Sequence, residues 1–131
     1  MTDEWLLKRT QIVFRGDITL VPHVLDFVIA YRDKVNPQDL TLGKAITELK
    51  QLHRDGGLRR VAHKLPLAAQ LYINEFKAKN GDPTYLKTAA RFIADGLYDY
   101  YLDPNYKPPK AAALDFDFDA AEKIRDERQG K

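Results

Sequence analysis

The chain has 131 residues, a length typical of one globular domain, and its hydrophobic fraction of 44% is ordinary for a protein with a core. It contains no cysteine, which excludes disulfides, thiolate metal sites and cysteine nucleophiles. The N-terminal residues 1–5 are acidic and polar, unlike a signal peptide, and no apolar run approaches the roughly 20 residues that cross a bilayer. We therefore expect a cytoplasmic protein without a membrane segment.

The net charge of +2 is unevenly distributed along the chain. Residues 1–42 carry a net charge of −1, residues 43–91 carry +6, and residues 92–131 carry −3. A basic centre of this kind suggests a polyanionic partner or a contact with the chain's own acidic end. The alternative is a solvated helix surface that is rich in Lys and Arg.

Two interpretations of residues 5–21 remain open. Trp5, Leu6 and Leu7 with residues 12–14 fit a short amphipathic helix that begins after Asp3. The β-branched residues instead favour a short β-hairpin, in which residues 11–14 and 17–21 pair about Arg15-Gly16.

From Pro22 onward, apolar residues recur at three- and four-residue steps, and proline is favoured at the first position of a helix. The first stripe ends at Asn36-Pro37 and consists of Val24, Phe27, Val28, Tyr31 and Val35. Asp39 or Thr41 is the expected cap of the next helix, whose stripe is Leu42, Ala45, Ile46, Leu49 and Leu52. Gly56-Gly57 ends this helix, because glycine accepts the left-handed conformation at that position.

A long helical segment follows from Leu58, with a kink or break expected near Pro66 and an end at Asn80-Gly81. Asp82-Pro83 then predicts the start of another helix, whose apolar face is Tyr85, Ala89, Phe92 and Ile93. Gly96 interrupts it, and residues 97–102 form one more short helix. We therefore predict an all-α domain over residues 1–103, a compact bundle of four to five helices.

The composition changes after Asp103. Pro104, Pro108 and Pro109 predict a semi-rigid linker, and an acidic-aromatic tail follows, so that residues 104–131 form an extended C-terminal region. Residues 114–119 of the tail alternate acidic and apolar side chains in the order Leu114, Asp115, Phe116, Asp117, Phe118, Asp119. We expect this segment to bind a basic groove on a protein partner, or to cover the chain's own basic face. A solvated tail is the alternative.

Catalytic and metal-binding patterns are missing from the sequence. His23, His53 and His63 have neither a cysteine nor a second histidine at a four-residue spacing. The acids of residues 115–119 do not match a calcium loop, which needs a glycine for its turn and a glutamate at its twelfth position. We therefore expect no enzyme activity, no cofactor and no metal site.

The candidate nucleic-acid contacts lie in the basic centre. Arg54, Arg59, Arg60, His63 and Lys64 surround the Gly56-Gly57 turn, and a second group lies farther along the chain. The residues expected to bind nucleic acid are Arg54, Arg59, Arg60, His63, Lys64, Lys87 and Arg91. They would contact phosphates, with strong salt dependence and little base readout. Stacking on unpaired bases is one interpretation of the tyrosines, and a core or core-edge position is the alternative, favoured for Tyr85 and Tyr100. The tyrosines in question are Tyr85, Tyr98, Tyr100, Tyr101 and Tyr106.

One region resembles a known family. The run Tyr85-Leu86-Lys87-Thr88-Ala89-Ala90-Arg91-Phe92-Ile93, then Gly96, then Tyr98-Asp99-Tyr100, resembles the C-terminal module of phage and mobile-element replication proteins of the replisome-organiser and helicase-loader kind. Upstream, Phe27, Tyr31 and Lys34 resemble the opening Phe-x-x-x-Tyr-x-x-Lys of that module. The similarity covers about residues 24–102.

The chain departs from the family pattern at two places: Arg32 stands where the family has proline, and Phe92-Ile93-Ala94 replaces Trp-Leu-Asn. The resemblance implies a role in loading or organising a replicative helicase, and no catalytic residues.

We therefore expect a non-enzymatic DNA-replication accessory protein of phage or mobile-element type. It would bind nucleic acid, single-stranded DNA among the candidates, and a protein partner such as a replicative helicase or single-strand-binding protein. The alternative is a small protein–protein interaction module, a phage- or plasmid-encoded inhibitor or adaptor of a host protein, that binds no nucleic acid.

Overall fold

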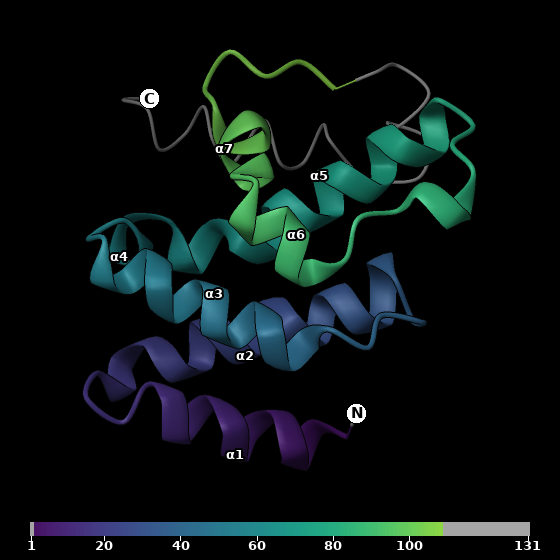
Figure 1. Cartoon of the computed structure of the whole chain (residues 1–131). Coiled ribbons are helices and arrows are strands. Elements are labelled where there is room, and N and C mark those ends of the chain that lie inside the picture. The colour runs from purple at the N-terminus through teal and green to yellow at the C-terminus, as the bar shows by residue number, and fades with distance from the viewer. Residues whose placement is uncertain (1, 109–131) are drawn as a thin grey trace.

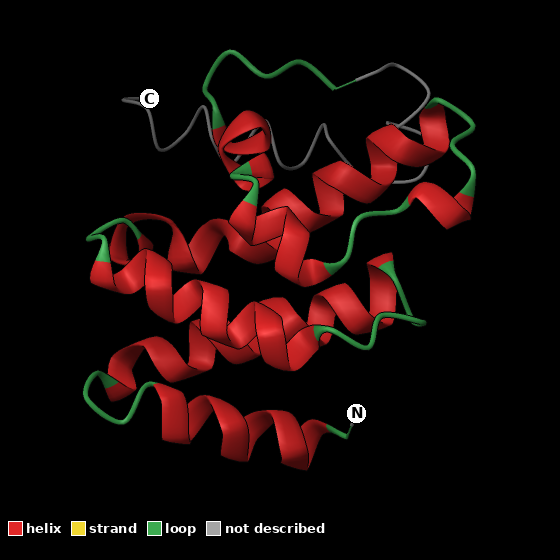
Figure 2. Cartoon of the chain, in the orientation of Figure 1, coloured by secondary structure: helices red, strands yellow, loops and turns green. Residues whose placement is uncertain are grey.

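The structure is a computed structural model that describes residues 2–108. Within that range every regular element is helical and no strand occurs (Figure 2), so the predicted all-α class is confirmed. The α-helices are α1 (Asp3–Val13), α2 (Val21–Ala30), α3 (Leu42–Arg54), α4 (Leu58–Val61), α5 (Leu65–Ala78), α6 (Ala89–Ala94) and α7 (Leu97–Leu102). The shorter elements are the 3₁₀ turns η1 (Ile18–Leu20), η3 (Ala62–Lys64) and η4 (Pro83–Tyr85) and the π-helical turn η2 (Tyr31–Val35).

The helices form a compact bundle around one core (Figure 1). In that view α1, α2 and α3 are stacked above one another, and α5, α6 and α7 lie on the far side of α3 from α1. Helix α3 contacts both α1 and α6, whereas α5 contacts α2, η2 and α7. The core is therefore continuous from the N-terminal helix to α7.

The N-terminal segment is a helix, and the hairpin alternative for residues 11–21 is wrong. Thr2 caps α1, since its hydroxyl accepts a hydrogen bond from the Trp5 backbone N–H at 3.1 Å. Leu6, Thr10 and Phe14 recur at four-residue steps and are buried. The Thr10 hydroxyl donates to the Leu6 carbonyl at 2.7 Å, which satisfies the polar group on this face.

The predicted helix ends are confirmed after α3 and α5. Gly56 has a φ of 85°, and the next N–H, of Gly57, donates to the Leu52 carbonyl at 3.0 Å. Asn80 has a φ of 53° after α5. Both positions follow the Schellman pattern, in which a left-handed residue lets the chain satisfy the last helical carbonyls. Pro66 breaks the segment as predicted, and α5 begins around it.

The helix predicted to start at Asp82-Pro83 begins later, so this prediction is wrong. Asp82 caps only the 3₁₀ turn η4, and the chain is then extended up to Thr88. Helix α6 begins at Ala89 because the Thr88 hydroxyl accepts from the Arg91 N–H. Tyr85 consequently lies outside the helix and its side chain is 78% exposed, not part of an apolar face.

An aromatic cluster joins α2, η2, α5 and α6. The Phe92 ring lies 5.9 Å from Phe27 and 5.5 Å from both Tyr31 and Tyr72, measured between ring centroids. Phe27, Tyr31 and Phe92 are completely buried. These aromatic positions of the family resemblance therefore pack against one another in the core.

Asp39 is the one buried carboxylate in the described chain, with 5% exposure. The sequence left Asp39 and Thr41 open as the cap of α3. Thr41 holds that position, and the two Asp39 oxygens divide their hydrogen bonds between two elements. One oxygen accepts from the Thr41 N–H and hydroxyl at 2.7 and 2.6 Å, and the other accepts from the Ala89 N–H at 2.6 Å. Asp39 thus ties the start of α6 to the segment that leads into α3.

We predict that Asp39→Ala lowers the free energy of unfolding by about 3 kcal/mol, because hydrogen bonds to a charged acceptor are lost and a buried N–H is left unpaired. Urea unfolding of the wild type and the variant measures this difference. The matched control is Asp26→Ala, which removes an exposed carboxylate with no ion pair or hydrogen bond within residues 2–108. Equal effects of the two substitutions would contradict the assigned role of Asp39.

Candidate nucleic-acid interface

The ends of α1, α3 and α4 meet at one end of the bundle. The Phe14 ring, just after α1, lies 6.1 Å from the His53 ring of α3, and the Lys50 ammonium lies 5.5 Å from the centre of the Phe14 ring. The His23 and His63 rings, from α2 and η3, lie 6.3 Å apart. Residues from four separate stretches of sequence therefore converge on this end.

Asp17 holds this end together. Its carboxylate accepts a hydrogen bond from the Thr19 hydroxyl at 2.6 Å, pairs with Arg59 of α4, and lies 3.7 Å from His53 Nε2. The hydrogen bond from Thr19 lowers the pKa of Asp17, and Arg59 and His53 act in the same direction against partial desolvation. The Arg59 guanidinium is therefore committed, at least in part, to a structural ion pair.

The other predicted contacts of this group are exposed. Arg54 is the last residue of α3, Arg60 belongs to α4, and His63 and Lys64 belong to η3. None of the four forms an ion pair with any of residues 2–108. The Gly56-Gly57 turn thus presents uncompensated positive charge, as the sequence suggested.

Lys87 and Arg91 lie apart from this group. Ala89, between them in sequence, is hydrogen-bonded to Asp39 near the start of α3, whereas Arg54 ends α3, about 18 Å farther along the helix axis. Both side chains also lie near the Asp95 carboxylate, at 3.7 and 3.4 Å. The structure therefore divides the predicted set into two groups and brings only the first together.

Two basic residues that the sequence did not single out join the first group. A shallow groove of about 420 Å³ separates α1 from α3. It is lined by Arg9, Val13, Thr47, Glu48, Lys50, Gln51 and Arg54. The four-residue spacing of Lys50 and Arg54 was a usable signal, because it places both on one face of a helix. Arg9 could be assigned to this group only once residues 3–13 were known to be helical. We call Arg9, Lys50, Arg54, Arg60, His63 and Lys64 the basic end.

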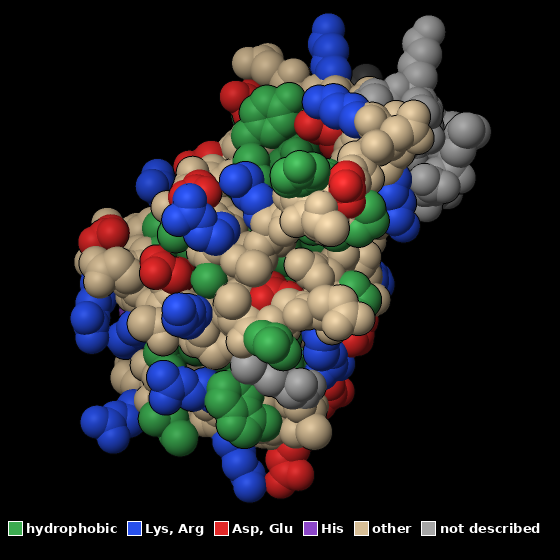
Figure 3. Space-filling model, turned by 45° about the vertical axis from the view of Figure 1, so that its right-hand side comes forward, with side chains coloured by type: hydrophobic (Ala, Val, Ile, Leu, Met, Phe, Trp, Pro, Cys, Tyr) green, Lys and Arg blue, Asp and Glu red, His purple; other side chains and the backbone are tan. Residues whose placement is uncertain are grey.

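Positive charge on the face drawn in Figure 3 does not form one continuous band. Lys and Arg side chains are dispersed there and alternate with Asp and Glu. This agrees with the division of the predicted residues into two groups. Exposed guanidinium and ammonium groups can contact phosphates, and such contacts carry no sequence information.

The structure places some tyrosines in the core and leaves others exposed. Tyr98 and Tyr101 are buried, and the Tyr106 hydroxyl donates to Glu75 at 2.9 Å. Desolvation, with Glu75 nearby, raises the pKa values of Tyr101 and Tyr106. Tyr85 and Tyr100, expected in the core, are instead exposed. They belong to η4 and α7, away from the basic end.

The predicted partner-binding segment, Leu114, Asp115, Phe116, Asp117, Phe118 and Asp119, lies outside the described residues. Within residues 2–108, no cluster of His, Asp and Glu side chains has the composition of a metal site, and no helix is long and apolar enough to span a membrane. Protein-family models, curated proteins and solved structures gave no significant match to this chain. The resemblance to replication proteins therefore stays a prediction.

We predict that Asp17→Asn destabilises the fold at pH 7, because the amide cannot form the ion pair with Arg59. The stability that the carboxylate supplies is present above its unfolded pKa of 3.8 and is lost as the pH falls through its lower folded-state pKa. Urea unfolding at pH 7 and at about pH 2.5 should therefore show a difference between wild type and variant that disappears in acid.

The control is Asp99→Asn, at an exposed carboxylate with no ion pair within residues 2–108. It should leave stability unchanged at both pH values. A wild-type advantage of Asp17 that persists in acid would show that the carboxylate charge is not the cause.

Proposed function

We propose that this chain is a non-enzymatic accessory protein that binds nucleic acid by contacting phosphates through its basic end. The observation that carries the proposal is the convergence of exposed, unpaired basic side chains from α1, α3, α4 and η3. Cations held on short helix ends can follow a phosphate backbone, and release of counterions drives such binding. Lys87 and Arg91, which share Asp95, have a lesser part in it.

The biological setting that we propose is DNA replication of a phage or mobile element. It rests on the resemblance over about residues 24–102. In this setting the basic end holds DNA, and a replicative helicase or single-strand-binding protein is the protein partner. The exposed Tyr85 and Tyr100 lie away from the basic end, so phosphate contact without base stacking is the proposed mode of binding.

Salt dependence tests the nucleic-acid proposal. The logarithm of the binding constant for an oligonucleotide should fall linearly with the logarithm of salt concentration, by about 0.9 per phosphate contact for duplex DNA and about 0.7 for single strands. Arg54→Ala combined with Arg60→Ala should reduce this slope by the amount that corresponds to about two phosphate contacts, because both guanidinium groups are free to pair with phosphates. Fluorescence anisotropy over a salt series measures it.

The matched control is Lys87→Ala combined with Arg91→Ala, which removes the same charge from the group near Asp95. It should change the slope much less. No binding to either single- or double-stranded oligonucleotides at low salt would sink the proposal, and a larger effect of the control pair would move the interface to α6.

A protein–protein interaction module is the second candidate, because apolar side chains are exposed at the opposite end of α1. Trp5 is 45% and Leu40 83% exposed. The Trp5 ring rests on Gly43, where a Cβ atom would lie 3.1 Å from it. Solvent-facing apolar groups of this size are a common mark of a protein contact.

The single tryptophan separates the two candidates. Trp5 precedes Arg9, the nearest member of the basic end, by one turn of α1, so nucleic acid bound mainly at Arg54 and Arg60 should shift its emission wavelength less than a partner that covers the ring. A protein partner that covers Trp5 should shift the emission to the blue, and Leu40→Ser should weaken that partner's binding. A blue shift of equal size on addition of an oligonucleotide alone would contradict the proposed position of the interface.

A further inference from the structure

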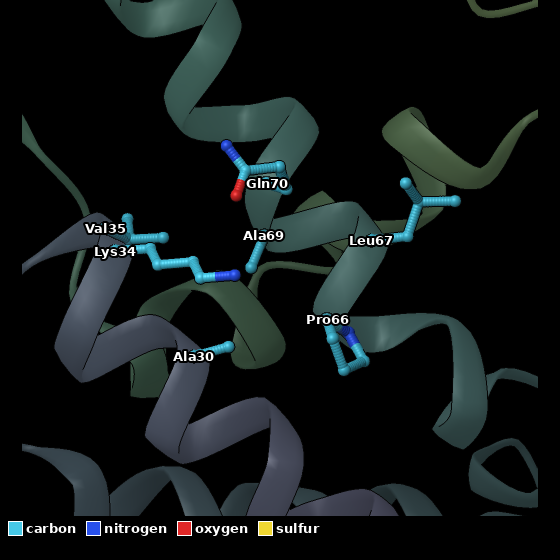
Figure 4. Close-up of a pocket in the computed structure, with 7 residues that line it drawn as sticks. All are labelled: Ala30, Lys34, Val35, Pro66, Leu67, Ala69 and Gln70. Carbon is cyan, nitrogen blue, oxygen red and sulfur yellow. The ribbon is translucent and has the colours of Figure 1, made fainter. Parts of the chain in front are cut away.

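A second groove, of about 240 Å³, lies between the π-helical turn η2 and the first turns of α5 (Figure 4). Its walls are mainly apolar and include Val35, Pro66 and Leu67. Two backbone irregularities border it: the π turn on one side and the proline that starts α5 on the other. π turns occur frequently at functional sites, which makes this groove the strongest candidate outside the basic end.

The polar groups at this groove are suited to an acidic peptide. In Figure 4 the Lys34 side chain extends from η2 toward Ala69 of α5, and the Gln70 amide is turned to the same side. Lys34 forms no ion pair with any of residues 2–108. Lys77 follows Gln70 by seven residues on α5, so it shares the same face of that helix. Lys34 is therefore the cation at the groove, and Lys77 lies about 10 Å beyond Gln70 along α5.

Next to the groove lies a buried hydrogen-bond donor without an acceptor. The Gln70 side-chain N–H donates to Asn74 Oδ1 at 3.0 Å, which leaves the Gln70 carbonyl oxygen available. Asn74 is 1% exposed, and its Nδ2 has no hydrogen-bond partner within residues 2–108. The groove itself offers the free Gln70 carbonyl oxygen, to which the peptide N–H groups of an occupant would donate.

We propose that residues 114–119 of the same chain dock in this groove. In an extended segment, Leu114, Phe116 and Phe118 lie on one side and the three aspartates on the other. The apolar side fits the walls of the groove, and the acidic side faces Lys34. The acidic and apolar side chains of the segment thus match the Lys34 ammonium and the apolar walls of the groove.

The chain is long enough for this contact. Tyr106 is hydrogen-bonded to Glu75 of α5, and Gln70 and Leu67 precede Glu75 by about 8 and 12 Å along the helix axis. The eight residues from Tyr106 to Leu114 span up to about 26 Å when extended, which is enough to pass around the helix. A short tether also gives an effective concentration in the millimolar range, so even a weak contact is populated within one molecule.

This docking is independent of the proposed DNA binding, and its test contains no nucleic acid. The chain has no native cysteine, so Ala120→Cys places a single nitroxide label directly after the segment. In the full-length ¹⁵N-labelled protein, the backbone amide signals of Val35, Leu67 and Gln70 should lose most of their intensity relative to the reduced, diamagnetic label. Phe116→Ser combined with Phe118→Ser should restore them.

Charge reversal supplies the specific control. Lys34→Glu should weaken the signal loss, and Asp117→Lys added to it should recover part of the loss. Lys44→Glu, an equal change on α3 away from the groove, should have no effect. The same spectra report whether each variant is folded.

Three results would overturn the proposal. A signal loss at Arg54 and Arg60 would place the segment on the basic end. A loss seen only when spin-labelled unenriched protein is mixed with unlabelled ¹⁵N protein would place it on a second copy. A spectrum without localised loss would mean that the segment does not dock.

Discussion

The extended segment between η4 and α6 is the point on which the arrangement of the helices depends. The Tyr31 hydroxyl donates to the Lys87 carbonyl at 2.6 Å, the Lys87 N–H donates to the Tyr72 hydroxyl at 2.8 Å, and the Ala89 N–H donates to Asp39. Three elements distant in sequence therefore hold the same short stretch. Burial raises the pKa of Tyr31 well above its usual value, so its hydroxyl stays protonated and remains a donor. Without these bonds the stretch would leave buried backbone groups unpaired.

The hydrogen bonds to Lys87 and Ala89 also determine which basic residues can act together. They fix α6 against α3 and place Phe92 between Phe27, Tyr31 and Tyr72. The side chains of Lys87 and Arg91 then lie near Asp95, while the basic end is assembled separately through Asp17. Basic residues that lie in the same stretch of the sequence are thus separated in space. A basic stretch of sequence becomes two surfaces with different degrees of charge compensation.

The sequence predicted what is decided within a few residues. Apolar periodicity predicted α2, α3 and α5, and Gly56, Pro66 and Asn80 predicted where helices end or break, because these signals act locally. It did not predict that α6 starts at Ala89, since Asp82-Pro83 is an equally good local start and the decision depends on a bond to Asp39, 50 residues away. Nor could it predict the ion pair of Arg59, whose partner is 42 residues distant. Arg54, Arg60, His63 and Lys64 were found from the sequence. Arg9 and Lys50, and the acidic partners of Arg59, Lys87 and Arg91, were not.

The basic end and the groove of Lys34 adjoin only near Lys64, which directly precedes α5. Helix α2 and the turn η2 together run from His23, beside His63, to Val35 at the groove, about 20 Å along the helix axis at 1.5 Å per residue. An acidic segment in the groove would therefore lie nearest to Lys64, two residues before Pro66, and farther from Arg54 at the end of α3. Docking would leave Arg54 open, and its electrostatic effect on phosphate binding there would be screened by salt. A segment that lay on the basic end would instead compete with phosphates directly. It would reduce the number of phosphate contacts at high salt as well as at low salt. The positions of the two surfaces thus favour a protein in which the acidic tail and the nucleic acid are held at the same time.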